Sequence, residues 1–382
     1  LADDSATGRQ TISSINTSGY HRTITEISER ADFTQLSGGA VLTYRSTGGH
    51  VSFNTIFYRF SLPLKKEYKP YNQFAIAGSE WYNCSIDFSR TIRNLHFFGE
   101  EAIDAKRRMA LINGALLTVD RHVDVSLLAR WIDKAYAAVS GDAFTEGSAP
   151  GNEQGLYIGM KMRPAGAITI DLYTDFYRFP WLRYQVDKPA DGEDHMLRVG
   201  FIPNKRIEIS SSIRREVKAK DQPKAEEATH PVGYNSRLDW RTGIEFKASR
   251  DLTVRNRLES VRYQIPGEPA SKGFLFLCDV IYKPALKPYK ITTRWQYFET
   301  TDFDSRIYAY ENDVPYSFSI PAFFGKGCRY YLLFSYEATR WLSCSARWAR
   351  TAYYGTTSIG DGADTLETSH RSQMKFQVSI KF

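Results

Sequence analysis

The sequence predicts an all-β fold and, more narrowly, a transmembrane, antiparallel, up-and-down β-barrel. Three observations lead to this prediction: a polar average composition rich in aromatic residues, an apolar–polar alternation along most of the chain, and connections that alternate between short and long. We expect about twenty strands, an even number, with eighteen as the alternative.

The composition is that of a protein without membrane-spanning helices. Of the 382 residues, 42% are hydrophobic and 14% are aromatic, and the mean hydropathy is −0.42. No apolar run approaches the roughly eighteen residues that a membrane-spanning helix needs, which excludes a helical membrane protein. A transmembrane barrel alternates lipid-facing with lumen-facing residues, so its average resembles that of a soluble protein. A large soluble β-protein is the alternative that the composition leaves open.

Period-two alternation is the main local signal. In residues 167–179, Ile168, Ile170 and Leu172 alternate with Thr169 and Asp171. The same pattern recurs in residues 251–263, in the histidine-led segment 122–131, and in 206–216, 289–297 and 340–350. Such segments reach about ten residues or more, which exceeds the usual globular strand and matches a tilted strand that crosses a bilayer. Aromatic residues gather near the segment ends, as in the girdles of membrane barrels.

The connections favour a barrel over a soluble sandwich. Tight turns are expected at STGGH, RNLH, VDRH, RPAG, IPNK, ASRD, KPALKP and EATR, and longer polar links at 61–78, 139–153, 179–194, 218–234 and 353–370. Bacterial outer-membrane barrels sort their connections in this way, with short periplasmic turns and longer external loops. We therefore expect a multi-pass protein of the outer membrane of a Gram-negative bacterium.

The end of the chain predicts how the barrel closes. The final segment alternates strictly, with Phe376, Val378, Ile380 and Phe382 on one face. We expect this last strand to pair with the first, which removes both exposed edges. Successive strands of such a barrel alternate in direction, and the last one must run toward the periplasm. Counting backward from it places a strand that runs outward near YHRTITEIS at 20–28. The same count places two wall strands, RIYAYEND and YSFSIPAFFG, within 303–326.

The polar face of the strands predicts the lining of the lumen. If the apolar face meets lipid, the lumen is lined by Arg130, Asp171, Asp175, Glu208, Arg214, Glu216, Arg255, Arg257, Glu259, Arg294, Arg347 and Lys375. Mixed charges on one face can pair across strands and stiffen the wall. They can also form a polar pathway, slightly cationic, for anionic solutes.

Residues 1–17 are expected to be a periplasmic linker or a plug of the lumen, and residues 18–382 the barrel. Leu1, Ile12 and Ile15 are the large apolar residues of the first segment, which are too few for a membrane strand. Its Asp3, Asp4 and Arg9 are candidates for pairing with charges of the wall. Because the chain opens without Met, we expect a removed leader or a longer parent chain.

Signals for catalysis, metals or cofactors are weak, and we predict none of them. The four cysteines lie in strand-like segments, where packing is favoured over disulfides. Asp194 and His195 are adjacent in a strand and therefore face opposite ways. Asp361, Asp364 and Glu367 could hold Ca²⁺, but the EF-hand pattern is absent and a solvated turn is favoured. No GxSxG, HExxH or Walker A motif is present.

Several phrases together resemble one family. TIRNLHFFGE, NEQGLYIGMKMRP, FYRFPWLRYQVD, DSRIYAYENDVPYSFSIPAFFGKGCRYYLLFSY and the ending GDGADTLE with KFQVSIKF resemble the C-terminal β-barrel region of Bacteroidota outer-membrane proteins that carry N-terminal helix-hairpin-helix repeats. The resemblance spans roughly residues 38–382. It implies a barrel fold and an outer-membrane location, and it implies no particular activity. The repeats, which often bind the DNA backbone, are not in this chain.

These features favour a channel or transport component with a polar, mixed-charge lumen. The alternative is a non-conducting structural subunit of a larger secretion or assembly complex of the outer membrane, followed by DNA-related uptake and, last, a surface enzyme. Expected partners are membrane lipid and lipopolysaccharide, the latter near KKEYK and REVKAK, and other outer-membrane or periplasmic proteins. Nucleic acid is not an expected partner of this region.

Overall fold

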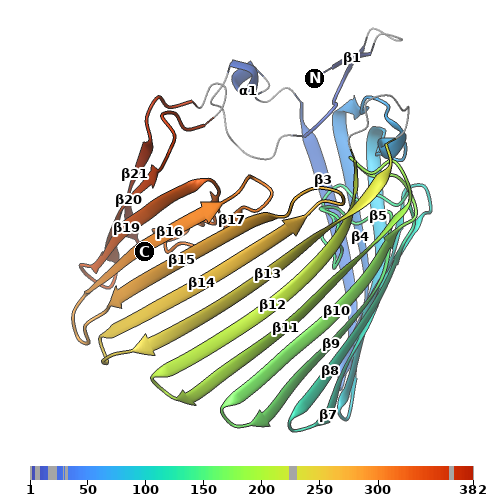
Figure 1. The fold of residues 1–382 in the computed structure, drawn as a ribbon. Helices are drawn as coiled ribbons and strands as arrows, with labels where there is room; N and C mark the ends of the chain where they lie inside the picture. The colour runs from blue at the N-terminus through green and yellow to red at the C-terminus, as the bar shows by residue number, and fades with distance from the viewer. Residues whose placement is uncertain are drawn as a thin grey trace. The chain divides into compact units, whose positions relative to one another are not determined.

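The computed structural model describes the chain except for residues 1, 5–8, 16–23, 29, 31–32, 223–229, 361–364 and 382. In this described part, seventeen antiparallel strands follow one another in the order of a closed up-and-down β-barrel (Figure 1). They are β3 (Gln35–Ser46), β4 (Gly49–Leu64), β5 (Gly78–Ile92), β6 (Leu95–Asp104), β7 (Met109–Asp120), β8 (Val123–Ile132), β9 (Glu153–Ala165), β10 (Ile168–Phe179), β11 (Ala190–Asn204), β12 (Ile207–Asp221), β13 (Val232–Lys247), β14 (Leu252–Gln264), β15 (Ser271–Tyr282), β16 (Tyr289–Thr300), β19 (Lys326–Glu337), β20 (Leu342–Tyr353) and β21 (His370–Ile380). The predicted all-β barrel is confirmed.

Four shorter strands lie outside this order. β1 (Ala2–Asp4) pairs with β2 (Arg9–Thr11), and β17 (Ile307–Tyr308) pairs with β18 (Ala322–Phe323), each as a separate two-stranded sheet. A five-residue helix, α1 (Ile24–Ser28), and one 3₁₀ turn, η1 (Pro70–Asn72), complete the described elements. No helix in the described residues is long and apolar enough to span a membrane.

The chain divides into two compact units, and each is described by itself. Unit 1 comprises Leu1–Met160, Tyr173–Glu193 and Lys218–Gly233, and unit 2 comprises Lys161–Leu172, Asp194–Val217 and Tyr234–Phe382. Unit 1 contains the consecutive pairs from β3 to β8, and unit 2 contains those from β13 to β16 and from β19 to β21.

The predicted alternation of short and long connections is confirmed. Two residues join β3 to β4, where Gly48 adopts a φ of 81° that the tight turn requires. Links of the other kind, such as 65–77 and 133–152, are much longer. Most short turns and long links therefore lie at opposite strand ends within each unit, although the 105–108 link of unit 1 is short and the 265–270 and 283–288 links of unit 2 are equal in length.

Three segments predicted to cross as wall strands do not do so. Residues 24–28 of YHRTITEIS form α1, and residues 20–23 lie outside the described residues. RIYAYEND and YSFSIPAFFG contribute only the two-residue strands β17 and β18. Although the described part of the chain holds about twenty strands, as predicted, the barrel order has an odd number of them. Counting strands by their alternating direction failed because residues 303–326 do not form wall strands. Apolar residues of this stretch are buried against neighbouring strands instead.

The N-terminal segment lies at the long-link end of unit 1, whereas we expected it at the short-turn end. Ile12 forms a parallel bridge with Leu64, the last residue of β4, through hydrogen bonds of 2.9 Å with Pro63 and Lys65. Ile12 is buried against Tyr58 and Phe60. The expected position assumed a crossing strand at 20–28, whereas the described residues of that stretch form α1. The predicted pairing of the Asp3, Asp4 and Arg9 side chains lies outside the described residues.

Candidate functional site

The two faces of the strands differ sharply in unit 2. Arg294, Tyr331 and Arg347 lie on one face of neighbouring strands and are almost completely buried. The residue that follows each of them, Trp295, Leu332 and Trp348, points to the other face and is 40–49% exposed. We call the charged face the inner face, because a barrel in lipid turns its apolar side outward.

The segment Thr301–Gly325, which joins β16 to β19, lies on this inner face of unit 2, and we call it the inserted segment. Its Ile307, Ala309 and Phe323 are buried in one cluster with Leu275 and Phe298 of the wall strands. Burying side chains of this size contributes roughly 1.5–3 kcal/mol each. Apolar contact therefore fixes the segment at both β17 and β18. These two short strands also pair with each other.

Three arginines of the wall hold the backbone of the inserted segment. Arg237 donates to the carbonyl oxygens of Asp304 and Arg306 at 3.1 and 3.0 Å. Arg257 donates to Tyr308 at 3.3 Å, and Arg294 donates to Tyr310 at 2.6 Å. The accepting carbonyls recur every second residue, which is the period of an extended chain. The segment thus crosses the inner face of several strands as an extended backbone.

Two carboxylates continue the same series of contacts. Glu311 accepts hydrogen bonds from Arg329 at 2.6 and 2.9 Å and from Arg347 at 2.5 Å. All three side chains are at most 6% exposed. Asp313 accepts a hydrogen bond of 2.6 Å from Lys375. Buried charges are tolerated only when they are paired in this way.

The carboxyl group of Asp313 has a shifted pKa. Burial raises this pKa, but the hydrogen bond from Lys375, the Val314 amide and the charge of Arg347 outweigh burial, so the pKa lies below its ordinary value. Asp313 is therefore ionised at neutral pH, and its contact with Lys375 is an ion pair.

A second buried charge cluster lies in unit 1. Arg130 donates to Glu153 at 2.6 Å and to both oxygens of Asp175 at 2.8 and 3.0 Å. Glu153 also accepts the amide hydrogens of Glu146 and Gly147, which belong to the long link 133–152. The cluster therefore ties this link to the strands that it leaves and enters.

The link 133–152 folds against the inner face of unit 1. Ala137 accepts hydrogen bonds through its carbonyl oxygen from Trp81 at 3.2 Å and from Asn83 at 3.0 Å. Asn83 also donates to the hydroxyl of Tyr136 at 3.3 Å. Burial raises the pKa of Tyr136, and the charges of Glu100 and Asp104 raise it further, against the Asn83 hydrogen bond. This phenol stays protonated at neutral pH.

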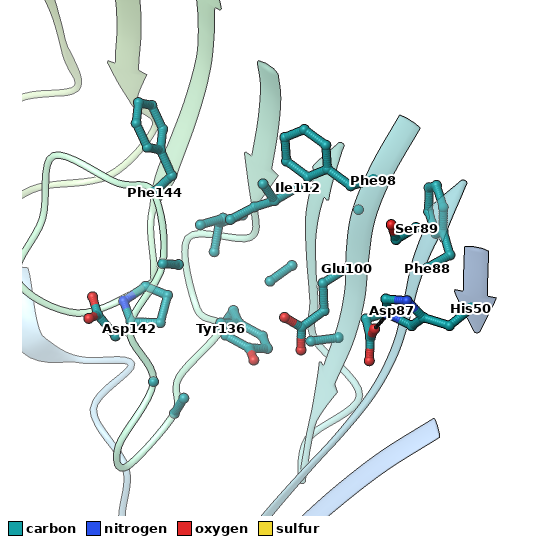
Figure 2. A pocket seen from close by; sticks show the side chains of 18 residues that line it. His50, Asp87, Phe88, Ser89, Phe98, Glu100, Ile112, Tyr136, Asp142 and Phe144 are labelled. Carbon is teal, nitrogen blue, oxygen red and sulfur yellow. Dashed lines mark hydrogen bonds and ion pairs between the residues drawn. The ribbon is translucent and has the colours of Figure 1, made fainter. Parts of the chain in front are cut away.

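A cavity of about 520 Å³ remains between the link 133–152 and strands β4–β8 (Figure 2). Its strand side is the inner face, because Ile112 pairs with Arg130 and with Glu100 in the register. A second cavity of about 520 Å³ adjoins it and shares Glu100 and Tyr136 with it. Both cavities lie wholly within unit 1.

Most residues predicted to line the lumen carry ion pairs. In addition to those above, Arg214 pairs with Asp194 and Glu216, and both Arg257 and Arg241 pair with Glu259. Further pairs join Arg255 to Glu245, Asp171 to Lys161, and Arg294 to Asp279. Glu208 is exposed in β12. Their position along a lumen remains a prediction. Phe376, Val378 and Ile380 lie in β21, which pairs with β20, and Phe382 lies outside the described residues.

Sequence reasoning missed several partners of these residues. Glu153, Asp279, Glu311, Asp313 and Arg329 complete the clusters. Asp279 and Arg329 alternate within strands and could have been found from the pattern. Glu311 and Asp313 follow a stretch without long alternation, and Pro315 and Pro321 after them argue against two central wall strands.

One group of potential metal ligands occurs in the described residues. Asp187, Asp221 and His230 bring their ligand atoms within 4.8 Å of one another. Asp187 and His230 are joined by a hydrogen bond of 3.1 Å, and both side chains are substantially exposed. The Asp361 and Asp364 positions considered for Ca²⁺ lie outside the described residues. Asp194, considered with His195 for catalysis, accepts hydrogen bonds from Arg214 at 2.9 and 2.7 Å.

The strand order and the opposed faces define a β-barrel of the outer-membrane type. The chain is similar in fold to the siderophore receptor PirA of Acinetobacter baumannii, with a TM-score of 0.53 and 8% identity over 92% of this chain and 65% of that one. It is also similar to a ferric enterobactin receptor, PfeA of Pseudomonas aeruginosa, with a TM-score of 0.55 and 9% identity over 91% and 62% of the two chains. OmpT of Vibrio cholerae matches 88% of this chain and 99% of its own, with 14% identity and a TM-score of 0.43.

These similarities establish the fold alone. The chain spans less than two thirds of the length of the two receptors. No protein-family model matches the sequence, and no curated protein sequence is significantly similar to it.

Proposed function

We propose that the protein is a transport component of the outer membrane of a Gram-negative bacterium, with a polar pathway that the inserted segment narrows. The observation that carries the proposal is the series of wall cations, from Arg237 to Lys375, that hold Thr301–Gly325 on the inner face. A barrel of sixteen to eighteen strands encloses an aqueous lumen, and wider transporters carry a plug. A segment that is anchored to the wall in this way is a means of narrowing such a lumen.

The contacts of the segment suit a closure that can be released. Charge-assisted hydrogen bonds are strong when formed, but their groups are readily solvated once water enters. A segment held mainly by such bonds can leave the wall without exposing a large apolar surface. Its buried apolar anchors are Ile307, Ala309 and Phe323 in one cluster and Val314 in another.

Single-channel conductance in planar bilayers tests the proposal. We expect small or no conductance for the intact protein, and large steps for a variant in which residues 303–324 are replaced by a short Gly-Ser link. The matched control is Glu299→Gln, which removes an exposed carboxylate at the edge of the same unit. Heat-modifiable migration on gels checks that the segment-free variant is folded. A folded variant that shows no conductance would contradict a transport role.

A non-conducting structural subunit is the second candidate. The inserted segment exposes Tyr316 at 92% and Phe318 at 85%, and exposed aromatic side chains are typical of protein contacts. If this alternative holds, neither the intact nor the segment-free protein conducts. Substituting Tyr316 and Phe318 by Ser would then release partner proteins without changing the barrel.

A further inference from the structure

We propose that the wall surface beneath the inserted segment is a binding site for an extended acidic polypeptide of another protein, which competes with the segment for it. The segment then acts as an internal ligand, and its contacts show how the site holds a peptide. The proposal deepens the proposed function and rests on it, because it names the partner that takes the place of the segment. All residues of the site belong to unit 2.

Three arginines of the wall bind the backbone of residues 304–310. Arg237, Arg257 and Arg294 donate to four main-chain carbonyl oxygens at 2.6–3.3 Å. Each of these arginines also forms an ion pair within the wall, and the carboxylates are those of Asp239, Glu259 and Asp279. Their charge is therefore balanced without the segment, and they serve it as hydrogen-bond donors. Any polypeptide in an extended conformation offers carbonyl oxygens at the same spacing.

Three further cations of the wall depend on the segment for their carboxylates. Within the described residues, every ion pair of Arg329, Arg347 and Lys375 is formed with Glu311 or Asp313. These cations lie on the neighbouring strands β19, β20 and β21, and they lose those partners when the segment leaves. Arginine clusters recognise acidic motifs in peptides. The surface therefore requires an acidic occupant, with two carboxylates placed two residues apart.

The segment satisfies the polar groups of this surface incompletely. Gln296 and Thr292 lie on the inner face of β16 and are 0% and 1% exposed. Among the described residues, no group bonds either amide atom of Gln296 or the hydroxyl of Thr292. Gln296 stands between Arg294 and Phe298, which both contact the segment. Because buried polar groups normally have partners, these two indicate a second occupant whose polar groups reach them.

The end of the segment that carries the carboxylates is accessible to a competitor. The Lys375 side chain is 39% exposed, and Tyr316 in the adjoining turn is 92% exposed. A competing carboxylate can therefore reach Lys375 while the segment is still bound, and it displaces Asp313 first. Arg329 and Arg347 are at most 6% exposed, so their exchange of Glu311 for the competitor follows.

Fluorescence anisotropy of a labelled peptide tests the site. The probe has the sequence of residues 304–314, DSRIYAYENDV, with fluorescein at its amino end. The receptor is the full chain with Glu311→Gln and Asp313→Asn in lipid nanodiscs, because these changes weaken the internal competitor and keep the wall. We expect the probe to bind this receptor at least about tenfold more tightly than the unchanged protein, since one charge-assisted contact accounts for that factor. Equal binding to the two proteins would overturn the proposal.

Two altered peptides separate the features that the wall recognises. Tyr308→Ser with Tyr310→Ser keeps the carbonyl oxygens and both carboxylates, so the affinity of this peptide should be unchanged. Glu311→Gln with Asp313→Asn removes both charges and should weaken the peptide by at least about tenfold. Equal affinity of the two altered peptides, or loss of binding by the first, would contradict recognition of an extended acidic chain.

A matched pair of receptor variants locates the site. Lys375→Gln, added to the receptor, should weaken the probe by about tenfold, because it removes one charge-assisted contact. Lys326→Gln removes a cation of β19 that pairs with Glu299 at the strand end, and it should leave binding unchanged. Equal effects of the two variants would place the peptide elsewhere. If heat-modifiable migration shows that the receptor is not folded, the segment-free variant replaces it with the same three peptides.

The peptide test is separate from the test of transport. Anisotropy detects the peptide on a closed barrel, and the conductance of the segment-free variant needs no peptide. A barrel that conducts but binds no peptide refutes the peptide site alone. A barrel that binds the peptide but never conducts refutes the transport role alone.

Discussion

Glu311 accepts hydrogen bonds from both Nε and Nη2 of Arg329, at 2.6 and 2.9 Å, so the inserted segment and the wall strand β19 meet through a fully buried bidentate pair. Bidentate geometry fixes direction as well as distance. The pair therefore sets where the segment lies on the inner face.

Replacing Glu311 by Gln should release the inserted segment. The change leaves Arg329 and Arg347 buried without their carboxylate, and breaking such a pair costs about 3–5 kcal/mol. Hydrogen exchange of the amides in 307–323 should then accelerate while strand amides stay protected. Glu299→Gln should leave exchange unchanged, and similar exchange in the two variants would show that apolar contacts alone hold the segment.

Acid should release the Lys375 end of the segment only at low pH. The folded pKa of Asp313 lies below its ordinary value of 3.8, so the pair stabilises docking above that value. The stabilisation is lost as the pH falls through the lowered folded pKa. Proteolysis by pepsin across pH 5 to 2, or hydrogen exchange over the same range, should show protection of 313–317 down to about pH 4.

The variant Lys375→Gln tests the cause of this pH dependence. It removes the main interaction that lowers the pKa of Asp313 and keeps the burial that raises it. Loss of protection should therefore begin at higher pH than in the intact protein. An unchanged onset would mean that another carboxylate governs release.

Replacing Gly155 by Ala should disturb the charge cluster of unit 1. A Cβ at this position would lie 2.4 Å from Cζ of Arg130, so the guanidinium must move away from Glu153 and Asp175. We expect a loss of about 3 kcal/mol in unfolding free energy, measured by urea titration in lipid vesicles. Gly38→Ala is the control, since nothing lies within 4 Å of its Cβ position. Equal stability of both variants would contradict a structural role of the cluster.

Replacing Leu332 by Arg should oppose insertion into lipid. Leu332 lies mid-strand on the outward face and is 48% exposed. A charge at the bilayer midplane of a barrel costs about 2–4 kcal/mol. Folding yield into vesicles should fall, whereas Leu332→Ala should cost much less. Comparable yields for Arg and Ala would place this face in water.

The strands could be predicted because their information is local. Alternation alone places Leu332 and Tyr331 on opposite faces of the sheet, and likewise Arg257 and Leu258. The same local pattern predicted the fold, the turns and most inner-face charges. The inserted segment could not be predicted, since its anchors are set by distant residues: Glu311 is 18 residues from Arg329 and 36 from Arg347.

The cavity in unit 1 was also hidden from sequence reasoning. Glu100 and Asp87 alternate like other inner-face charges, and the pattern does not tell that no arginine of the described residues forms an ion pair with them. Only the register, which places Asp87 opposite Glu100 and Glu100 opposite Ile112, shows which neighbours each carboxylate has. Partner identity depends on tertiary pairing, which a single sequence does not display.

The contacts of Asp304, Arg306, Tyr308 and Tyr310 with the wall arginines pass through main-chain oxygens, which every amino acid possesses. Selection on those contacts acts on the arginines and does not constrain the side chains of the four accepting residues. Random mutagenesis should thus find the stretch 304–310 tolerant at its solvent-facing positions, while Glu311 and Asp313 resist exchange. A lineage could accordingly reshape the exposed surface of this segment, and with it the solutes or partners it meets, without rebuilding the wall that holds it.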